Sequence, residues 1–550
     1  MDDPFESIAH VVSQHALSHP SRDAIIFLER GETETGRLTY AELDARAASH
    51  AAGFAAEGLA GRAVAIAMPP GLAFAALFLG CLRAGAIAVP VPFPDSDRSA
   101  RRIASILADA RPAAAVTEKD AVSKLAAIAP DVPILEHDRL AAIAGPAAVV
   151  SAHDPAMIQY TSGSTEAPKG IVITHANLMA NQRMIRRAFD LPTGAVGATW
   201  LPHFHDMGLI GTILQPLFLG STTVAMPPRA FVQKPIRWLK AIARYGADTA
   251  GAPSFGYELC VRTVQPEEAA KLDLSSWQVA FCGAEPIRAP VLEQFAQRFA
   301  ASGFSAKAFL PCYGLAETTL ITTAAAPRSG LTQREIAPGG GAPRSFVSCG
   351  RPVEGSTLLL RDENGAPASS GEICVGGPHV SPGIWNGARG RIDPFDTLVR
   401  AGGQSHLPTG DIGTLIDGEL FVVDRLKDIL VLYGAKLHAA DVEAIALDHD
   451  AGLRAAAAFA VDDGRRERLI VVCEIGRREL AATLSAARGD AIAKRIAQAH
   501  GVVPAVHLVA YGELPRTSSG KVQRFAARTK FLSGAWGVPN VGAGAASDST

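Results

Sequence analysis

The chain has 550 residues, of which 48% are hydrophobic and 19% are charged. This composition excludes an intrinsically disordered protein, because there are enough apolar side chains to bury a large core. The 52 Lys and Arg residues nearly balance the 54 Asp and Glu residues, leaving a formal net charge of -2. Such a chain has no general electrostatic attraction for nucleic acid or for an anionic membrane surface. We therefore expect a small molecule, or a protein met through a local patch, as the partner, and no nucleic acid.

Compartment signals point to the cytoplasm. The seven cysteines are scattered without a C-x-x-C pair, which argues against a zinc ribbon and against a disulfide framework. The acidic start, MDDPFES, lacks the profile of a signal peptide. The most apolar run covers only residues 72–82, whereas a membrane-spanning helix needs about 20 apolar residues. We expect a cytoplasmic protein without integral membrane association.

The first third of the chain alternates between helical and strand patterns. The spacing predicts a helix over 38–58, a strand over 62–68, a helix over 71–83 and a strand over 86–91. Strand–helix–strand units are typical of a parallel sheet with helices packed on it. Similar units recur to about residue 320, with helices predicted over 236–245 and 290–301. The predicted fold class is α/β.

The pattern changes in the second half. Residues 324–344 are rich in Gly and Pro without periodicity, which predicts a loop. A compact β subdomain is then indicated by short strand patterns over 356–361, 372–375 and 419–423. From about Lys427 a small α+β unit follows, and the Gly, Ala and Ser residues of 533–550 predict a disordered tail.

The strongest chemical signal is the segment YTSGSTEAPKG at residues 160–170. Small hydroxyl residues and glycine let backbone N–H groups and hydroxyls approach phosphate oxygens, and Lys169 adds a cation. The G-x-x-x-x-G-K-[ST] spacing of a Walker A loop is missing, and apolar residues on both sides predict that the loop joins two strands. A polar hairpin turn is the alternative, but eight of the eleven positions carry the residue types that a phosphate-binding loop needs, which favours phosphate binding.

This segment resembles the phosphate-binding loop of the adenylate-forming superfamily, which includes acyl-CoA synthetases, luciferases and nonribosomal-peptide adenylation domains. Further motifs of that superfamily follow in order: YGLAETT from Tyr313, TGD ending at Asp411, DRLKD over 424–428 and PRTSSGK ending at Lys521. The resemblance implies an N-terminal adenylation core over residues 1–424, made of two α/β subdomains and a small β subdomain. It also implies a smaller, mobile α+β C-terminal lid domain over 425–532.

The resemblance further implies ATP and Mg²⁺ as cofactors. Tyr313 would stack on adenine, Glu317 would hold Mg²⁺, Asp411 would accept the ribose hydroxyls and Arg425 would donate to ribose or phosphate. The nucleotide-binding set that the motifs imply is Thr161, Ser162, Gly163, Ser164, Thr165, Lys169, Gly283, Ala284, Glu285, Pro286, Tyr313, Gly314, Asp411 and Arg425. Without the motifs around them, Tyr313 would be interpreted as a core tyrosine and Glu317 as a solvated helix charge. Asp411 and Arg425 would be interpreted as a surface salt bridge.

Lys521 lies in a Ser/Gly-rich loop, where a lysine is usually just solvated. In the superfamily this lysine swings in to meet the reacting carboxylate and the α-phosphate, and its charge offsets the charge that builds on phosphorus. The resemblance implies that the C-terminal domain then rotates about a hinge residue, here Lys427, to open the site for thiol attack. Gly434 would enter the site in that second conformation.

The stretch WLPHFHDMGLI at residues 200–210 resembles fatty acyl-AMP ligases, in which H-D-M-G-L is a hallmark. His205 would then be a catalytic residue beside the acyl and thiol entrances. His203 and His205 could instead face one way on a strand and bind metal, but no third ligand is evident. The residues that would line the acyl pocket are Phe204, Gly251, Ser254, Phe255, Gly256 and Gly283, although a packed core is an equally good interpretation of the two phenylalanines. We reject a serine hydrolase, because in GAPSFG at residues 251–256 Ser254 is one residue beyond the serine position of the G-x-S-x-G nucleophile elbow.

The implied activity is formation of acyl-AMP and pyrophosphate from a fatty acid and Mg·ATP, then acyl transfer to the phosphopantetheine thiol of an acyl carrier protein. Such a reaction feeds polyketide- or lipopeptide-type biosynthesis. The nearest alternative is an acyl-CoA synthetase using free CoA, because the insertion that restrains domain movement in acyl-AMP ligases, placed here at 330–346, is shorter than usual. A non-catalytic acyl-adenylate sensor would need a decayed site, whereas the motif residues are all present.

Overall fold

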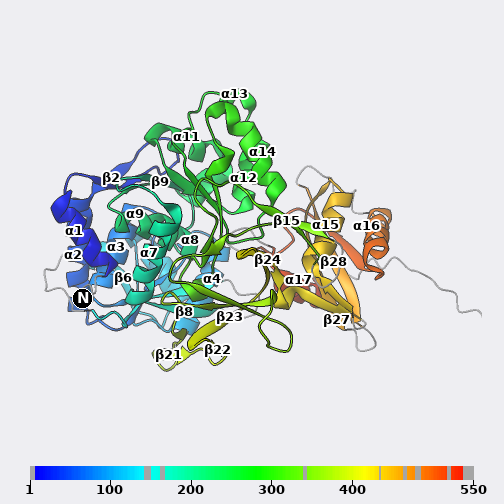
Figure 1. Ribbon diagram of the computed structural model, residues 1–550. Helices are drawn as coiled ribbons and strands as arrows, with labels where there is room; N and C mark the ends of the chain where they lie inside the picture. Colours follow the sequence, from blue (N-terminus) through cyan, green and yellow to red (C-terminus); the bar gives the residue numbers. More distant parts are fainter. Residues whose placement is uncertain are drawn as a thin grey trace, which may run out of the picture.

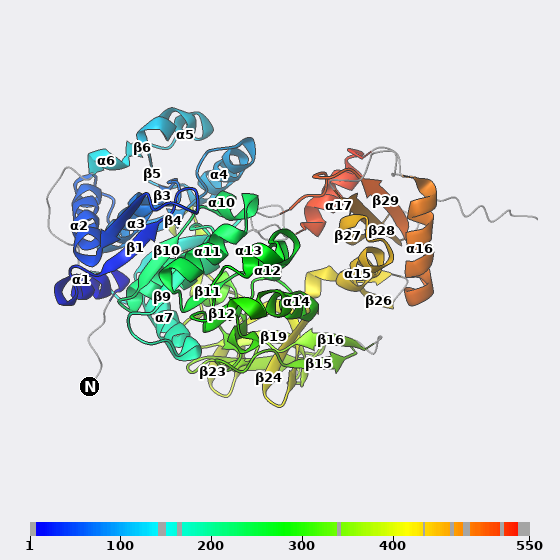
Figure 2. The ribbon, with the colours of Figure 1, turned by 90° about the horizontal axis from the view of Figure 1, so that it is seen from above.

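The computed structural model describes residues 7–140, 150–161, 168–337, 343–432, 435–462, 467–476, 485–516 and 522–536. The chain forms a large lobe and, beyond strand β24 (Glu419–Arg425), a smaller lobe that carries the C-terminal elements (Figures 1 and 2). Two large sheets with helices on their faces confirm the predicted α/β class. Among the described residues, no helix combines the length and the apolar character that crossing a membrane requires.

The first sheet has the strand order β21-β20-β8-β7-β4-β3-β5-β6. Its parallel part confirms the predicted strand–helix–strand units, because β3 pairs in parallel with both β4 and β5. The strands are β3 (Ala63–Ile66), β4 (Ile87–Pro90), β5 (Ala114–Thr117), β6 (Ile134–Glu136), β7 (Pro155–Thr161), β8 (Lys169–Thr174), β20 (Gly383–Asn386) and β21 (Arg391–Pro394). The helices before and between them are α1 (Ile8–Ser18), α2 (Tyr40–Ala56), α3 (Leu72–Arg83), α4 (Asp97–Ala110), α5 (Val122–Ile128) and α6 (His137–Leu140).

Local signals place the first helices. A capping box between Thr39 and Glu42 starts α2, with each side chain bonding the other residue's backbone N–H. The helix α3 is apolar on nearly all sides and is buried from Phe74 to Leu82. A helix that is apolar all round belongs in a core. This burial accounts for the apolar run at residues 72–82.

The second sheet has the order β17-β14-β13-β12-β11-β9-β10-β1-β2. The N-terminal strand β1 pairs in parallel with β10, about 200 residues downstream, and local patterns could not predict this pairing. The strands are β1 (Asp23–Phe27), β2 (Gly36–Thr39), β9 (Val196–Thr199), β10 (Thr222–Ala225), β11 (Thr249–Gly251), β12 (Val279–Cys282), β13 (Phe309–Tyr313), β14 (Thr323–Ala324) and β17 (Arg351–Pro352). The helices of this region are α7 (His175–Phe189), α8 (Asp206–Leu209), α9 (Gln215–Phe218), α10 (Pro228–Gln233), α11 (Ile236–Tyr245), α12 (Ser254–Thr263), α13 (Pro266–Ala269) and α14 (Ala289–Phe299).

The β subdomain also agrees with the prediction. Its strands are β18 (Thr357–Arg361), β19 (Ser370–Gly376), β22 (Val399–Ala401), β23 (Gln404–Ile416) and β24 (Glu419–Arg425). The loop predicted over 324–344 is partly wrong, because β15 (Gln333–Ile336) pairs with β16 (Arg344–Val347). Arg334 and Glu335 at the centre of β15 are exposed, so this hairpin lacks the apolar alternation that marks a half-buried strand.

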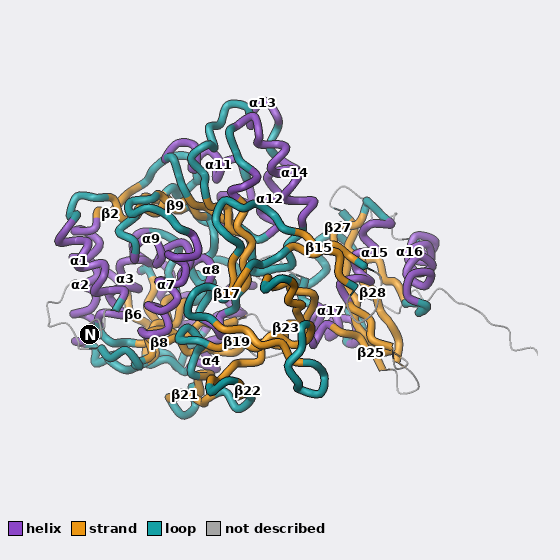
Figure 3. The backbone as a smooth tube through the Cα atoms, in the orientation of Figure 1, coloured by secondary structure: helices purple, strands orange, loops and turns teal. Residues whose placement is uncertain are grey.

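The smaller lobe confirms the predicted α+β unit (Figure 3). Strand β28 lies between an antiparallel β27 and a parallel β29, with α15 and α16 packed on one face and α17 on the other. The elements are β25 (Ile429–Leu432), β26 (Ala435–His438), α15 (Ala439–His449), β27 (Leu453–Asp462), β28 (Glu467–Ile475), α16 (Ala486–His500), β29 (Ala505–Val509) and α17 (Arg524–Leu532). Most of the predicted tail, residues 537–550, lies outside the described residues.

Candidate active site

The predicted phosphate loop connects two antiparallel strands. Strands β7 and β8 pair in a register that ends with Thr161 opposite Lys169, which confirms that the loop joins two strands. Beside it, Tyr160 is buried and donates from Oη to the Asp109 carboxylate at 2.6 Å, which fastens the hairpin to α4. The implied phosphate ligands Ser162, Gly163, Ser164 and Thr165 lie outside the described residues.

The Tyr313, Asp411 and Arg425 side chains, predicted from two separate motifs and the hinge, meet at one carboxylate. Tyr313 Oη donates to Asp411 Oδ2 at 2.9 Å, and Arg425 Nε donates to Asp411 Oδ1 at 2.6 Å. The β23–β24 register sets Asp411 opposite Arg425, so the sheet itself creates the ion pair. We call these three residues the ribose cluster. Each Asp411 oxygen accepts one described hydrogen bond and can accept one more, since an ionised carboxylate has about four acceptor sites.

The electrostatics of the cluster follow from its burial. Burial, followed by the neighbouring Asp411 charge, raises the pKa of the Tyr313 phenol well above its ordinary value, so the hydroxyl stays a donor. The Asp411 charge raises the pKa of Arg425. At Gly314 an added Cβ would lie 1.6 Å from the Leu320 carbonyl oxygen, so the turn after Tyr313 accepts only glycine.

Glu317 links the ribose cluster to the fatty acyl-AMP ligase motif. It lies in a short 3-10 turn, Ala316–Thr318, and burial raises the pKa of its carboxyl group. The Arg425 charge opposes this shift and the Asp206 charge adds to it, so these three residues share one electrostatic environment. Asp206 in turn holds His205, whose Nδ1 lies 2.6 Å from Asp206 Oδ1. Sequence reasoning missed Asp206, although its place directly after His205 was a usable signal.

Residues 283–286 form a turn that is tied to α12. Ala284 has φ +64°, a strained conformation for a residue other than glycine and a frequent mark of functional sites. Glu285 Oε1 accepts from the Phe255 backbone N–H at 2.8 Å, and Ser254 Oγ donates to the Pro286 carbonyl at 3.3 Å. Ser254 and Phe255 thus shape the turn of the implied nucleotide-binding set.

The glycines predicted to widen an acyl pocket lie in tight packing instead. A Cβ on Gly251 would come within 2.3 Å of the Phe281 ring, and one on Gly256 within 2.7 Å of the Ala252 Cβ. A Cβ on Gly283 would lie 2.8 Å from the Cys312 carbonyl oxygen. Close packing, rather than a visible opening, accounts for these three glycines.

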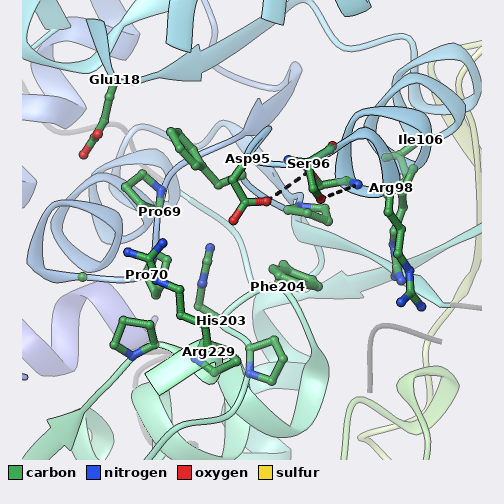
Figure 4. Close-up of a pocket in the computed structure, with 18 of the residues that line it drawn as sticks. Pro69, Pro70, Asp95, Ser96, Arg98, Ile106, Glu118, His203, Phe204 and Arg229 are labelled. Atoms are coloured by element: carbon green, nitrogen blue, oxygen red, sulfur yellow. Dashed lines mark hydrogen bonds between the residues drawn. The ribbon is translucent and has the colours of Figure 1, made fainter. Parts of the chain in front are cut away.

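A cavity of about 920 Å³ lies between the two large sheets of the large lobe and the smaller lobe. Phe204 lies on its wall with His203, and Pro69 and Pro70 add apolar surface (Figure 4). Phe27 also lines the cavity. Of the predicted acyl-pocket residues, Phe204 is among those lining this cavity, whereas Gly251, Ser254, Phe255 and Gly256 are not. A ligand with a long apolar part can enter a space of this size and composition.

Arginines at one end of this cavity were not predicted. Arg98 and Arg102 project from the first two turns of α4 at helical spacing and line the cavity. Burial, followed by the neighbouring Arg98 charge, lowers the pKa of Arg102. The sequence DRSARRI carries this i, i+4 arginine pair, so the signal was present. These cations suit the anionic end of a ligand.

The flanks of the two predicted catalytic loops line this same cavity. Thr161 and Pro168 flank the phosphate loop, and Arg516 and Gln523 flank the lysine loop. A hydrogen bond from Arg98 to the Arg516 carbonyl joins the two lobes at this point. Lys521 and Gly434 lie outside the described residues, and Lys427 has only its backbone described, in the 3-10 turn Leu426–Asp428.

The two histidines of the H-F-H-D stretch have separate partners. His203 Nε2 lies 3.0 Å from the Met68 carbonyl oxygen, and burial lowers the pKa of His203 to about 4, so its ring is neutral. His205 faces Asp206. Within the described part of the chain, no three His, Cys, Asp or Glu residues gather in a way that could hold a metal ion. The strand geometry needed for a histidine metal pair is not found here, because the residues form a turn before α8.

Comparison with known proteins agrees with this arrangement. The family model described as "AMP-binding enzyme" matches residues 12–385. The medium-chain-fatty-acid–[acyl-carrier-protein] ligase JamA of Moorena producens is 34% identical over 96% of this chain and 96% of its own length. The 4-hydroxyphenylalkanoate adenylyltransferase of Mycobacterium tuberculosis is 33% identical over 96% of this chain and 92% of its own. A structure from a study of fatty acyl-adenylate ligases from E. coli and L. pneumophila is similar with a TM-score of 0.83 and 32% identity, covering 97% of this chain and 99% of that one.

Proposed function

The chain belongs to the AMP-binding enzyme family, and from that premise we propose that it activates a fatty acid with ATP and passes the acyl group to an acyl carrier protein. Relatives that span nearly the whole chain are named for fatty-acid activation and for carrier-protein ligation. The observation that carries the proposal is the shared cavity, where the flanks of the phosphate loop and of the lysine loop meet beside Phe204. Two loops from opposite lobes can act on one substrate only if they face one space.

The first half-reaction joins the acid to AMP. A carboxylate oxygen of the fatty acid attacks the α-phosphorus of ATP, and the bond from that phosphorus to the pyrophosphate oxygen breaks. Tyr313 stacks on adenine and Asp411 accepts from the ribose hydroxyls, using the acceptor sites that the ribose cluster leaves open. The hydroxyl residues of 161–165 and Lys169 hold phosphate oxygens, and the Lys521 ammonium meets the α-phosphate and the acid.

The second half-reaction moves the acyl group to sulfur. The phosphopantetheine thiol loses its proton to water as its sulfur attacks the acyl carbon, the bond from that carbon to the AMP oxygen breaks, and the thioester and AMP leave. We place His205 beside this thiol, with Asp206 fixing the orientation of its ring. Rotation about Lys427, carrying the lid domain 425–532 away from the core 1–424, would expose the acyl-adenylate to the carrier arm.

Glu317 is the residue that would hold Mg²⁺. Burial of its carboxylate next to Asp206 and Asp411 leaves negative charge that a cation would neutralise. Mg²⁺ takes one or two protein carboxylates and completes its shell with phosphate oxygens and water, so a cluster of three protein ligands is not required. Bound there, the ion would neutralise charge on the phosphates of ATP.

We further propose a cytoplasmic enzyme that serves polyketide- or lipopeptide-type biosynthesis. The acid belongs to the fatty class, since the apolar part of the cavity wall, with Phe27, Pro69 and Phe204, suits an alkyl chain. The carrier protein, rather than free CoA, is the preferred acceptor, as the names of the relatives suggest. These statements extend the proposal beyond adenylation itself.

Two measurements on the full chain test the proposal. Pyrophosphate release with ATP, Mg²⁺ and saturated fatty acids of graded length is expected to depend on the acid, and the absence of release with every acid would point to a non-catalytic sensor. Free CoA and a phosphopantetheine-bearing carrier protein are then offered side by side, with the unmodified carrier protein as control. Acyl-carrier formation is expected to dominate, and efficient acyl-CoA formation would assign the chain to the acyl-CoA synthetases.

A further inference from the structure

The described residues on the two sides of the lysine loop contact each other, and we call these two segments, residues 512–516 and 522–524, the neck. Arg516 forms a backbone bridge with Val522, and the Gln523 N–H donates to the Pro515 carbonyl at 2.9 Å. The described residues directly before and after the lysine loop are therefore held next to each other. Lys521 directly precedes Val522 in the sequence, so its backbone is attached to this neck.

A carboxylate inside the sheet holds the N-terminal side of this neck. Glu474, at the end of the central strand β28, is 1% exposed. Its side chain lies on the sheet face that packs against α17, together with Ile470 and Val472. Glu474 accepts from the backbone N–H groups of Gly512 and Leu514 at 3.1 and 3.0 Å, and from Arg516 at 2.9 Å.

A second carboxylate holds the C-terminal side. Glu443 on α15 is 12% exposed and receives a two-pronged contact from Arg524, with Nε at 2.6 Å and Nη2 at 2.8 Å. Arg524 is the first residue of α17, three positions beyond Lys521. It also contacts Asp428 of the hinge segment. One guanidinium thus connects the loop, the helix α15 and the hinge.

We propose that Glu443 and Glu474 are positioning residues for Lys521, which fix both sides of the lysine loop and thereby serve the adenylation half-reaction. This inference rests on the role given to Lys521 in the proposed function. A buried carboxylate that is fully engaged by its own chain cannot bind substrate, so its effect must pass through what it holds. The held segments here are the two flanks of one loop, and Arg516 and Gln523 on those flanks line the reaction cavity.

The same lobe supplies a matched control. Asp450 accepts a two-pronged contact from Arg488, in which the bond from Nη2 is 2.8 Å long. Asp450 is slightly more exposed than Glu443, and Arg488 is slightly less exposed than Arg524. The described hydrogen bonds of the Asp450 side chain come from Gly452 and Arg488, and none comes from residues 512–524. D450N therefore removes an ion pair from this lobe and leaves the loop neck alone.

The test compares E443Q, E474Q and D450N in the two half-reactions separately. Adenylation is followed by fatty-acid-dependent pyrophosphate release, and acyl transfer by reaction of supplied acyl-AMP with the carrier protein. We expect the kcat of adenylation to fall tenfold or more in E443Q and E474Q, since a misplacement of about 1 Å can cost about 10²-fold. The KM for ATP, acyl transfer and both activities of D450N should stay within about twofold of the parent.

Lys521→Ala provides the second readout. In that background E443Q and E474Q should cause no further loss of adenylation, because residues that act through one group are not additive. Equal loss of both half-reactions in both variants would show that the carboxylates only stabilise the lobe, and would overturn the inference. Unchanged adenylation in E443Q and E474Q would overturn it as well, while a large loss in Lys521→Ala would leave the proposed function standing.

Discussion

The ribose cluster of the large lobe and the neck of the lysine loop in the smaller lobe both combine a buried carboxylate with an arginine, but the two carboxylates differ in how many of their acceptor sites the chain itself uses. Asp411 and Glu474 are both buried carboxylates that hold an arginine. Glu474 accepts three hydrogen bonds, from two backbone N–H groups and Arg516, and Arg454 forms an ion pair with it at 3.6 Å, so its own chain engages both oxygens.

Asp411, in contrast, accepts one described hydrogen bond on each oxygen, and its arginine is half-exposed. A carboxylate with open acceptor sites at the edge of a site can bind a ligand, whereas one that its own chain engages more fully maintains a shape. The comparison teaches that the partners of a buried carboxylate say more about its role than its burial does. It also predicts that mutations in the ribose cluster change nucleotide affinity, and that mutations in the lysine loop and its neck change rate.

The sharpest separation of the two lobes comes from Lys521→Ala. Loss of its ammonium should lower the kcat of adenylation by about 10²–10³-fold, because a preorganised charge that meets the transition state is removed. ATP binding should be nearly unchanged, since adenine and ribose are held by the large lobe. Pyrophosphate release and equilibrium ATP binding measure the two quantities, and retained turnover would refute the role of Lys521.

Glu317→Gln is expected to have the next largest effect. Adenylation should fall by about 10²-fold as the carboxylate ligand for Mg²⁺ is lost. The folded state favours protonated Glu317, because burial raises its pKa, so the parent loses stability as pH rises through that raised value.

Glu317→Gln should consequently be more stable than the parent at neutral pH, and the difference should disappear once the pH falls below the pKa of the unfolded chain. Thermal unfolding at several pH values checks this sign. A variant that is less stable at neutral pH would contradict the buried-charge explanation.

Asp411→Asn tests the other half of the comparison. Weaker hydrogen bonds to ribose should raise the KM for ATP about tenfold or more, in line with the lower end of the roughly 1.5–3 kcal/mol that a hydrogen bond to a charged group contributes. The kcat at saturating ATP should change far less than in Lys521→Ala. Tyr313→Phe, which removes the 2.9 Å contact to Asp411 but keeps the ring, is the milder control. A pure loss of kcat in Asp411→Asn would break the division between the lobes.

The smallest effect is expected for Arg344→Ala. Arg344 on β16 pairs with Asp441 on α15, so this contact joins the lobes away from both loops. Partly exposed ion pairs contribute about 0–1 kcal/mol, and both half-reactions should therefore remain within about threefold of the parent. A selective gain in acyl transfer would show instead that the pair restrains the lobe.

Much of the fold could be predicted because its signals are local. The alternation of helix and strand, the hairpin around the phosphate loop and the α+β character of the smaller lobe follow from spacing and punctuation. Pairing between strands far apart in the sequence has no local signal, and the pairing of β1 with β10 could therefore not be predicted. The exposed hairpin of β15 and β16 was missed because buried and exposed residues do not alternate along β15.

The candidate site could be predicted where a motif fixes the residues. Tyr313, Asp411 and Arg425 meet as their motifs suggested. The cavity was not predictable, because its wall is collected from distant segments such as α4 and the turn at Phe204. Glu443 and Glu474 were missed because a lone glutamate in an alanine-rich helix or at a strand end resembles an ordinary solvated charge.

The phosphate loop connects two antiparallel strands, and this connectivity has an electrostatic consequence. In nucleotide-binding folds where the loop starts a helix, the helix dipole places about half a positive charge against the phosphates. A connection between two strands has no aligned helix dipole, so backbone N–H groups, hydroxyls and lysine side chains would have to supply the favourable charge. One of those lysines, Lys521, belongs to the other lobe. ATP bound to the large lobe alone should therefore remain unreacted until the smaller lobe joins it.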